Sequence, residues 1–398
     1  MHHLDKLKVN SVLLKDHVGH HKIRRGVLTG FNEAFVIDSA TRDRLLAEDP
    51  KSTEIIKPFL VGEDARRYAA TFRGRYLIWT YIGVPINQYP AIFAHLQQHQ
   101  EQLEKRWDKG NHWWELRHCD YYADFKDPKI IYPNICYQPE FAIEDYGYYS
   151  NQKTFIIPVK DMYLLALLNS KVMKFIFKMV LPKLRGNFFE PSYVFMKDIP
   201  IRCINYVTSG DKRAYYRDKA RLLYQQCLQE QGKPDCIMDF VDHQLTQQPE
   251  ASDVVHDLLE MLAEEMSRLN KQKHNLQQEF LICLVNMLRI KPDKDGRAGI
   301  EVLTGKSRLL DYIGDYQKGE EALSPDGLWE LVCKNRARVE ANLMQTSLKT
   351  HILTTYQESL DKILPLKEQL QYTDALIDAV VYRLYGLTKD EILVVEGE

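Results

Sequence analysis

The chain has 398 residues, with 53 Lys and Arg against 55 Asp and Glu, and 45% of its residues are hydrophobic. This length supports about two to four domains, and the hydrophobic fraction excludes a chain that is disordered throughout. The formal charge of −2 hides an asymmetry, because residues 1–205 hold 29 basic and 23 acidic side chains and the rest hold 24 and 32. The first half is therefore the part expected to face phosphate.

No secretory signal or membrane span is recognisable in the sequence. The most apolar stretch, Tyr163–Leu181, is interrupted by Lys171, Lys174 and Lys178, whereas a span needs about 20 nearly uncharged residues. The seven cysteines are scattered and form no CxxC, a pattern typical of reduced thiols. We therefore expect a soluble, cytoplasmic protein with no membrane partner.

Residues 1–205 are predicted to form a mixed α+β domain. Short runs rich in Ile, Val, Phe and Tyr and bounded by turn residues predict strands. These runs are Ala34–Asp38, Arg75–Tyr81, Lys129–Tyr132 and Thr154–Val159. Apolar residues recurring at helical spacing predict helices over Tyr89–Arg106 and Tyr163–Met179.

Residues 206–398 are predicted to form a mostly α-helical domain. A long helix is expected over about 252–290, because Ser252 can cap it and apolar residues follow at coiled-coil spacing. A helical tail is expected over about 324–395, beginning where Ser324 provides a cap and Pro325 occupies the first helical position.

Within this tail, the sequence predicts where individual helices end and begin. Pro365 is expected to break one helix, and Thr373 to open another that Gly386 closes. Thr388 and Glu391 have the spacing of a capping box for a last short helix.

No catalytic motif is recognisable. The chain has no GxGxxG, no GxxxxGK[ST] and no nucleophile elbow. Amino-methyltransferases that act on adenine use an (Asn/Asp)-Pro-Pro-aromatic loop, and the nearest segment, Tyr132-Pro133-Asn134-Ile135, lacks the second proline. We therefore assign no catalytic residue.

Metal-binding candidates are equally weak. Two histidine-containing groups lack the paired short spacings of zinc sites. These groups are His17, His20 and His21, and His112, His118 and Cys119. A metal-dependent nuclease needs clustered carboxylates and a lysine, for which the candidates are Asp120, Asp124, Asp127 and Lys129. Solvated histidines and ordinary acidic loops explain these patterns, so we assign no metal site.

Basic residues set beside glycine and asparagine stand out more clearly. From Lys160 to Tyr206 there are 8 basic and 3 acidic residues. Within this stretch, Gly186 separates Arg185 from Asn187, and a glycine allows close backbone approach. Arg and Asn are the side chains that pair bidentately with guanine and adenine edges. A solvated helix face followed by an ordinary loop is the alternative explanation.

Two further basic groups are weaker candidates. Arg24 and Arg25 lead into Gly26–Asn32, where two glycines, Thr29 and Asn32 suit a turn that could hold a phosphate. A purely structural turn explains that segment equally well. Lys109 belongs to a third group in which cations neighbour Trp113 and Trp114, and these tryptophans suit a protein core better than a binding surface.

The same segments carry a family resemblance in seven ordered blocks. The blocks are Gly26–Asp38, Glu54–Tyr68, Tyr76–Thr80, Leu103–Arg117, Pro128–Pro133, Tyr163–Lys171 and Leu184–Ile201. They resemble the TaqI-like specificity, or target-recognition, domain of adenine-specific DNA methyltransferases and of Type IIG (Eco57I-like) restriction-modification enzymes. The segment Thr373–Ile392 is similar to the helical C-terminus that follows this domain in the same enzymes.

The resemblance implies that double-stranded DNA is the partner. In the family, the recognition domain reads DNA opposite a methyltransferase domain, and S-adenosylmethionine methylates a flipped adenine. That catalytic domain would precede Gly26, yet only 25 residues do. We therefore expect specificity without catalysis, and no cofactor in this chain. S-adenosylmethionine, and Mg²⁺ if the system also cleaves, would belong to a missing catalytic domain or subunit.

The resemblance and the basic groups together assign roles to ten residues. Lys171, Lys178, Lys183 and Arg185 are expected to contact phosphate, and Asn187 and Arg185 to meet base edges. The other predicted DNA-binding residues are Arg24, Arg25, Thr29, Asn32 and Lys109. The implied biological role is a specificity subunit, or one half of a split enzyme, in bacterial restriction-modification and phage defence.

Two alternatives stay open at this point. In the first, the chain is itself an active adenine-specific methyltransferase or endonuclease fragment. In the second, the helical half scaffolds such an enzyme and DNA contact is incidental.

Overall fold

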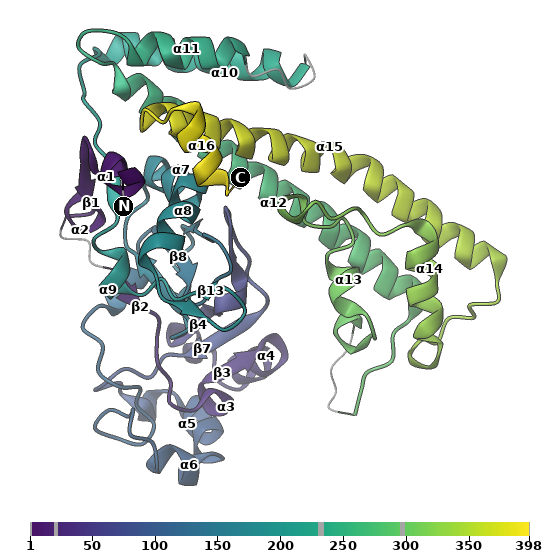
Figure 1. Ribbon diagram of the computed structural model, residues 1–398. Helices are drawn as coiled ribbons and strands as arrows, with labels where there is room; N and C mark the ends of the chain where they lie inside the picture. The colour runs from purple at the N-terminus through teal and green to yellow at the C-terminus, as the bar shows by residue number, and fades with distance from the viewer. Residues whose placement is uncertain (1, 20–22, 230–234, 295–298, 398) are drawn as a thin grey trace. The chain divides into compact units, whose positions relative to one another are not determined.

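The computed structural model describes residues 2–19, 23–229, 235–294 and 299–397 (Figure 1). They form a mixed α+β arrangement followed by a helical C-terminal region, which confirms the predicted fold class. The chain divides into two compact units. Unit 1 contains residues 1–227, 234–264 and 377–398, and unit 2 contains residues 228–233 and 265–376. The division predicted between residues 205 and 206, which rests on sequence character, remains a proposal.

Unit 1 contains two four-stranded sheets. One has the order β10 (Tyr149–Ser150), β4 (Ile56–Leu60), β7 (Arg75–Ile78) and β3 (Val36–Asp38). The other has the order β2 (Arg24–Arg25), β11 (Thr154–Ile157), β8 (Lys129–Pro133) and β9 (Ala142–Glu144). Neighbouring strands in both sheets are antiparallel, except that β10 and β4 are parallel.

Three two-stranded pairs complete the described strands of unit 1. They are β1 (Ser11–Leu13) with β14 (Pro200–Arg202), β5 (Ala65–Arg66) with β6 (Ala69–Ala70), and β12 (Lys183–Leu184) with β13 (Phe188–Phe189). All three pairs are antiparallel.

The helices of unit 1 are mostly short. They are α1 (His2–Lys8), α2 (Leu14–His17), α3 (Asn32–Phe35), α4 (Ser39–Glu48), α5 (Pro90–Gln97), α6 (Gln100–Glu104), α7 (Met162–Asn169), α8 (Lys171–Val180), α9 (Tyr193–Met196), α11 (Asp235–Leu245) and α16 (Lys389–Glu396), with nearly all of α10 (Gly210–Gln229). The first residues of α12 (Ser252–Leu288) and the last residues of α15 (Thr346–Leu384) also belong to this unit.

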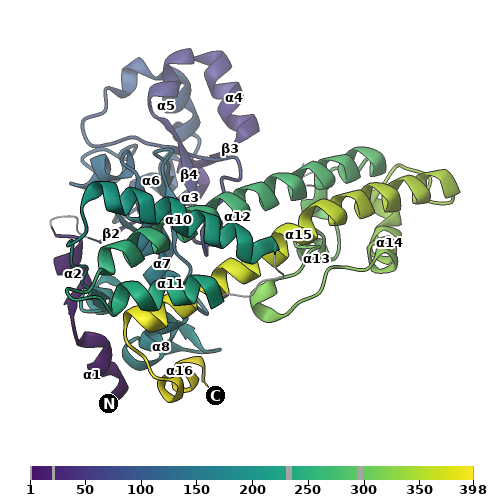
Figure 2. The same ribbon diagram turned by 90° about the horizontal axis from the view of Figure 1, so that it is seen from above.

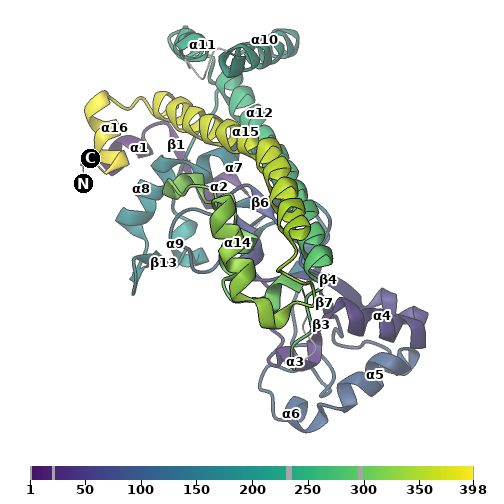
Figure 3. The same cartoon turned by 90° about the vertical axis from the view of Figure 1, so that its right-hand side faces the viewer.

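Unit 2 is helical. It is built from residues 265–288 of α12 and residues 346–376 of α15, together with α13 (Lys306–Leu310) and α14 (Pro325–Lys334). In Figures 2 and 3 these parts of α12 and α15 lie side by side, and Gln369 donates a 3.1 Å hydrogen bond to Glu265 between them. The rings of Phe280, Tyr312 and Tyr356 meet in the core, with centroids 5.0–5.4 Å apart.

The predicted strands are found, with one correction. Runs beginning at Arg75, Lys129 and Thr154 form β7, β8 and β11. Ala34–Asp38, by contrast, starts as the end of α3 and becomes a strand only at Val36. The neighbours Ala34 and Phe35 are both buried, and an alternating strand cannot bury consecutive side chains on one face.

Two predicted single helices are each interrupted. The helix expected over Tyr163–Met179 is divided into α7 and α8 at Ser170, whose backbone is extended and whose hydroxyl caps α8 by accepting from Met173 N–H. The helix expected over Tyr89–Arg106 is divided into α5 and α6. Periodicity alone misses such breaks, because the apolar spacing continues across a local cap.

The helix breaks predicted at Pro365 and Thr373 are wrong. One helix, α15, continues from Thr346 to Leu384 with Pro365 inside it. Pro365 is exposed, so water can satisfy the carbonyl that loses its N–H partner. The buried neighbours Ile363 and Leu370 hold the helix on either side of it.

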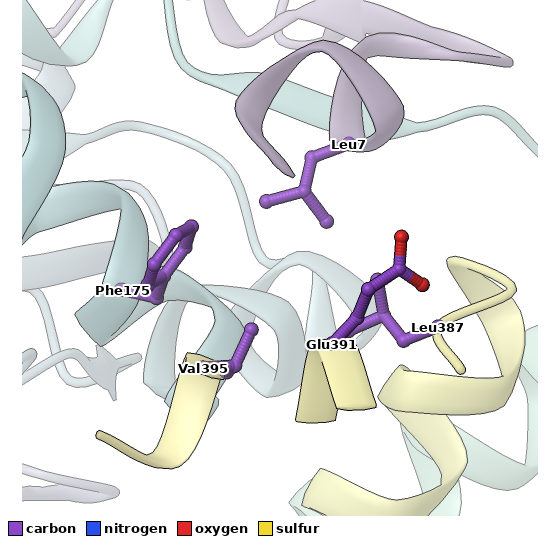
Figure 4. A pocket seen from close by; sticks show the side chains of 5 residues that line it. All are labelled: Leu7, Phe175, Leu387, Glu391 and Val395. Atoms are coloured by element: carbon purple, nitrogen blue, oxygen red, sulfur yellow. The ribbon is translucent and has the colours of Figure 1, made fainter. Parts of the chain in front are cut away.

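The predicted C-terminal signals are confirmed. Gly386 has a φ of +64°, and the N–H groups of Gly386 and Leu387 bond to Arg383 and Tyr382, which is a Schellman end. Thr388 and Glu391 form the predicted capping box of α16. Figure 4 shows the small apolar pocket where α16 meets α1 and α8, lined by Leu7, Phe175, Leu387, Glu391 and Val395.

Acid is expected to loosen α16. Lys6 and the Thr388 cap lower the pKa of Glu391 from its ordinary value of 4.5 to about 2. A carboxylate with a lowered folded-state pKa stabilises at higher pH, and this contribution is lost as pH falls from about 4.5 to 2. The protection factors for hydrogen exchange over residues 389–396, which correct for the intrinsic rate at each pH, should therefore fall in that range. A Glu391→Gln variant should already exchange faster at pH 7 and lack the acid-dependent step.

No helix among the residues that the structure describes is long and apolar enough to cross a membrane.

Candidate nucleic-acid interface

The loop predicted to read DNA is the tip of a β-hairpin. Strands β12 and β13 pair Leu184 with Phe188, so the three residues Arg185, Gly186 and Asn187 form the turn. Gly186 and Asn187 both have positive φ, +83° and +61°, a conformation that Gly adopts freely and Asn tolerates. All three turn residues are exposed, so the arginine and asparagine side chains are available to a partner.

The hairpin is anchored to unit 1 through its second strand. Phe189 and Cys136 exchange two backbone hydrogen bonds, of 2.7 and 3.1 Å. The Phe189 side chain is 4% exposed, and its ring lies 6.0 Å from that of Phe177 on α8. The exposed tip therefore stands on a buried base, which limits the conformational entropy that binding would cost.

Aromatic side chains lie beside the tip. Phe188 is 41% exposed and Tyr137 is 52% exposed, and their rings meet edge to face at 6.1 Å. The ammonium of Lys174 lies 6.0 Å from the Tyr137 ring centroid. Together with Lys183, Arg185 and Asn187, these three side chains form a surface that we call the hairpin patch. Cations interleaved with aromatic rings suit nucleic-acid contact.

The positive charge on α8 is concentrated. Burial lowers the pKa of Lys174, and the neighbouring cations Lys178, Arg67 and Lys171 lower it further. Cations that lower one another's pKa create a positive electrostatic potential. A phosphate that approached them would reduce this repulsion. Lys178 and Lys183 are exposed, and neither has an ion pair among the described residues.

Lys171 has a different environment from the other predicted phosphate contacts. Its ammonium pairs with Glu396 of α16 at 2.7 Å, and its backbone N–H donates to Asp378 of α15 at 2.7 Å. The lysine thus helps to hold the C-terminal helix. Contact between Lys171 and phosphate remains a prediction. It would require the ammonium to leave Glu396 for the phosphate.

The Gly26–Asn32 turn is closely packed. A Cβ on Gly26 would lie 1.9 Å from the carbonyl oxygen of Asn151, so only glycine fits there. Thr29 is 1% exposed, and its hydroxyl donates to Asn32 at 2.6 Å. The Thr29 hydroxyl therefore stabilises the turn from within.

The remaining predicted contacts have partners of their own within the protein. Arg24 pairs with Asp124 at 3.1 Å and Arg25 donates to the carbonyl of Gln152 at 3.1 Å. The ammonium of Lys109 donates to the carbonyl of Glu104. Of the ten predicted residues, the hairpin brings together Lys183, Arg185 and Asn187.

Arg106 supports both of the other basic segments, a role that sequence reasoning missed. Its guanidinium is 7% exposed and donates to the carbonyls of Thr29 (2.7 Å), Trp113 (2.7 Å) and Glu115 (2.9 Å). Burial lowers the pKa of Arg106 to about 10. One side chain thereby ties the turn at residue 29 to the loop at residues 113–115.

The weak metal and nuclease candidates do not gather into a site in the described residues. His17 pairs with Asp161 at 2.9 Å, His112 stacks on Trp114, and Lys129 pairs with Glu144 rather than with a carboxylate of the predicted set. His20 and His21 lie outside the described residues. A different group, His256, Asp257 and Glu260, has metal-ligating atoms within 4.8 Å of one another, but Arg213 already holds both carboxylate oxygens of Asp257.

Comparison with protein families identifies the segment that carries the hairpin. Residues 57–201 match the TaqI-like C-terminal specificity domain. The resemblance expected from the sequence is confirmed over these residues, which run from β4 to β14 and include the whole hairpin patch.

Other comparisons are more distant. The chain is similar to a solved structure of the Type IIL restriction-modification enzyme MmeI in complex with DNA, with 14% sequence identity and a TM-score of 0.36. The similarity covers 60% of this chain and 32% of that chain, so this chain spans about a third of the length of that enzyme. The comparison with curated proteins found no match.

Proposed function

We propose that this chain is the DNA target-recognition part of a restriction-modification system. It reads double-stranded DNA through the hairpin patch, and a methyltransferase or endonuclease domain or subunit elsewhere modifies adenine or cleaves. In this proposal S-adenosylmethionine, and Mg²⁺ where the system cleaves, belong to that other part.

The observation that carries the proposal is the hairpin tip inside the specificity-domain segment. Arg185 and Asn187 are exposed on a turn whose base is buried, and these residue types recognise base edges in the major groove. Phe188 and Tyr137 add stacking surface, and the crowded lysines of α8 add positive charge. The arrangement supports base reading by the tip and phosphate contact by the lysines.

Selection of bound duplexes from a random library, followed by affinity measurement, tests this proposal. Arg185→Ala and Asn187→Gly should each relax the sequence preference at one position, costing about 1–3 kcal/mol against the preferred duplex. Glycine is chosen at position 187 because it keeps the left-handed backbone. Lys178→Ala and Lys183→Ala should weaken binding to all duplexes and reduce the salt slope by about 1 each.

Lys160 provides a matched control. It lies in the same basic stretch but pairs with Asp145 at 3.0 Å, so Lys160→Ala should leave both affinity and preference almost unchanged. If the hairpin variants bind and select DNA as the parent does at every salt concentration, the hairpin does not read DNA.

The enzymatic alternative has a direct test. The purified chain would be incubated with labelled S-adenosylmethionine and DNA, and separately with Mg²⁺ and plasmid. Turnover by the chain alone would show that it is itself an enzyme and would contradict the present proposal. The scaffolding alternative predicts instead that the hairpin variants keep full DNA binding. Truncation after residue 205 is a poor test of it, because Arg202 bonds to Leu384 and Glu250 within unit 1.

A further inference from the structure

Unit 2 carries a concentrated positive surface that the hairpin does not explain. Six exposed cations occupy two segments of the chain. Residues 288–294 contain three cations and one acid, and residues 332–338 contain three cations and no acid. We call them the arm patch: Arg289, Lys291, Lys294, Lys334, Arg336 and Arg338. Among the described residues none of the six forms an ion pair or a side-chain hydrogen bond.

The backbone joins the two segments into one platform. The N–H of Lys291 donates to Arg338 at 2.8 Å, and the N–H of Glu340 donates to Arg289 at 3.1 Å, around the antiparallel bridge between Ile290 and Val339. Residues more than 45 positions apart in the chain are therefore held side by side.

The cations that flank the bridge face outward. Val339 is 5% exposed and belongs to the unit 2 core, whereas its neighbours Arg338 and Glu340 are exposed. Arg289 and Lys291 are likewise exposed on either side of the half-buried Ile290. The exposed residues on both sides of the bridge therefore face solvent. Two acids accompany these cations, the exposed Glu340 and the half-buried Asp293.

Buried Asn335 fixes the second segment. It is 2% exposed, its amide donates to the carbonyls of Thr304 and Leu331, and it accepts from the Thr304 N–H. The platform is therefore preorganised for a ligand that follows its surface.

Helix ends explain only part of this charge. Arg289 and Lys334 adjoin the C-termini of α12 and α14, where the helix dipole favours a cation. Lys291, Lys294, Arg336 and Arg338 lie beyond those ends. Arg289 has a φ of +50°, a conformation that suits glycine or asparagine better, so backbone geometry does not account for an arginine there.

We propose that the arm patch binds the phosphate backbone of double-stranded DNA as a second contact, separate from the hairpin. Unpaired, exposed cations on a rigid platform release counterions when they meet phosphates, and this gives affinity without sequence preference. The choice of duplex DNA over other polyanions rests on the proposed recognition function. The patch itself rests on the geometry of unit 2.

The test uses the full chain and a variant with Lys291→Gln, Arg336→Gln and Arg338→Gln. For duplexes of any sequence, affinity at low salt should fall at least about tenfold, and the salt slope should fall by about 3, near 0.9 for each lost phosphate contact. The base preference selected by the parent should stay the same.

A matched control removes three other cations from unit 2 that are already paired: Arg268→Gln, Lys306→Gln and Lys318→Gln. Their partners are Glu265, Glu301 and Asp315, at 2.7, 2.8 and 3.6 Å. This control changes net charge equally, so an equal loss of affinity in both triple variants would overturn the proposal. Circular dichroism of each variant verifies that the helices are retained.

The possible outcomes separate this proposal from the hairpin function. If the hairpin variants lose DNA and the arm variant does not, recognition stands and the arm contact is wrong. If the arm variant loses DNA and the hairpin variants do not, the arm contact stands and the hairpin is not the reader. The arm proposal is also wrong if the parent binds no duplex. It is equally wrong if the arm variant binds poly-glutamate more weakly than the parent does but binds DNA as well as the parent.

Discussion

Replacing Lys129 with methionine is expected to lower the free energy of unfolding by about 3–5 kcal/mol. Lys129 is 0% exposed, and its ammonium pairs with Glu144, which is 1% exposed, between β8 and β9. Burial lowers the pKa of Lys129 while Glu144 opposes that shift. Without the ammonium, the Glu144 carboxylate would be left buried with no cation beside it. Urea denaturation followed by circular dichroism measures the loss.

A second substitution separates loss of the pair from loss of packing. Glu144 also accepts the backbone N–H of Tyr146 at Oε1 and that of Tyr148 at Oε2. A glutamine keeps one of these two acceptors through its single oxygen, and it leaves no unpaired charge in the core. Lys129→Met with Glu144→Gln should therefore be more stable than Lys129→Met alone. Lys105→Met, which breaks an exposed pair with Glu101, should leave stability almost unchanged. Equal losses at Lys105 and Lys129 would contradict the argument from burial.

Replacing Arg106 with alanine is expected to cost about 3 kcal/mol or more, because several buried carbonyls would lose their donor together. The guanidinium satisfies Thr29, Trp113 and Glu115 at 2.7–2.9 Å and lies 4.6 Å from the Phe35 ring centroid. Arg106→Lys should lose nearly as much, since a compact ammonium cannot span three directions as a planar guanidinium does.

Arg117 offers the control for Arg106. It is exposed and pairs with Asp108 at 3.3 Å, so Arg117→Ala should have little effect on unfolding. Tryptophan fluorescence during denaturation reports on the same region, because Trp113 and Trp114 pack against the unit 1 core. If Arg106→Lys proves as stable as the parent, the guanidinium geometry is not what holds this loop.

Features that depend on a few neighbouring residues were predictable from the sequence. Ser324 caps α14 with Pro325 in its first turn, and Thr388 and Glu391 form their capping box. These contacts close within one turn of helix, so the pattern of residues specifies them. The ordered blocks of the first half likewise indicated the specificity domain found at residues 57–201.

Features that depend on distant partners were not predictable. Pro365 was expected to end a helix, but packing on either side keeps α15 continuous. Tyr137 could not be assigned to the hairpin patch, because it comes about 50 residues before Phe188 in the chain. For Lys171, the sequence shows a cation in a basic stretch and does not show that Glu396 is its partner.

Charge illustrates the same distinction. The sequence by itself determined the fold class, the local caps and the basic character of the hairpin stretch, because each is set by residue type and short spacing. Only the tertiary structure decided which cations are available. It pairs Arg24 and Lys171 with acids, buries Arg106 among carbonyls, and brings Lys291 and Arg338 together within the half that is acidic overall. The reason is physical, since availability to a phosphate depends on burial and on partners from remote parts of the chain.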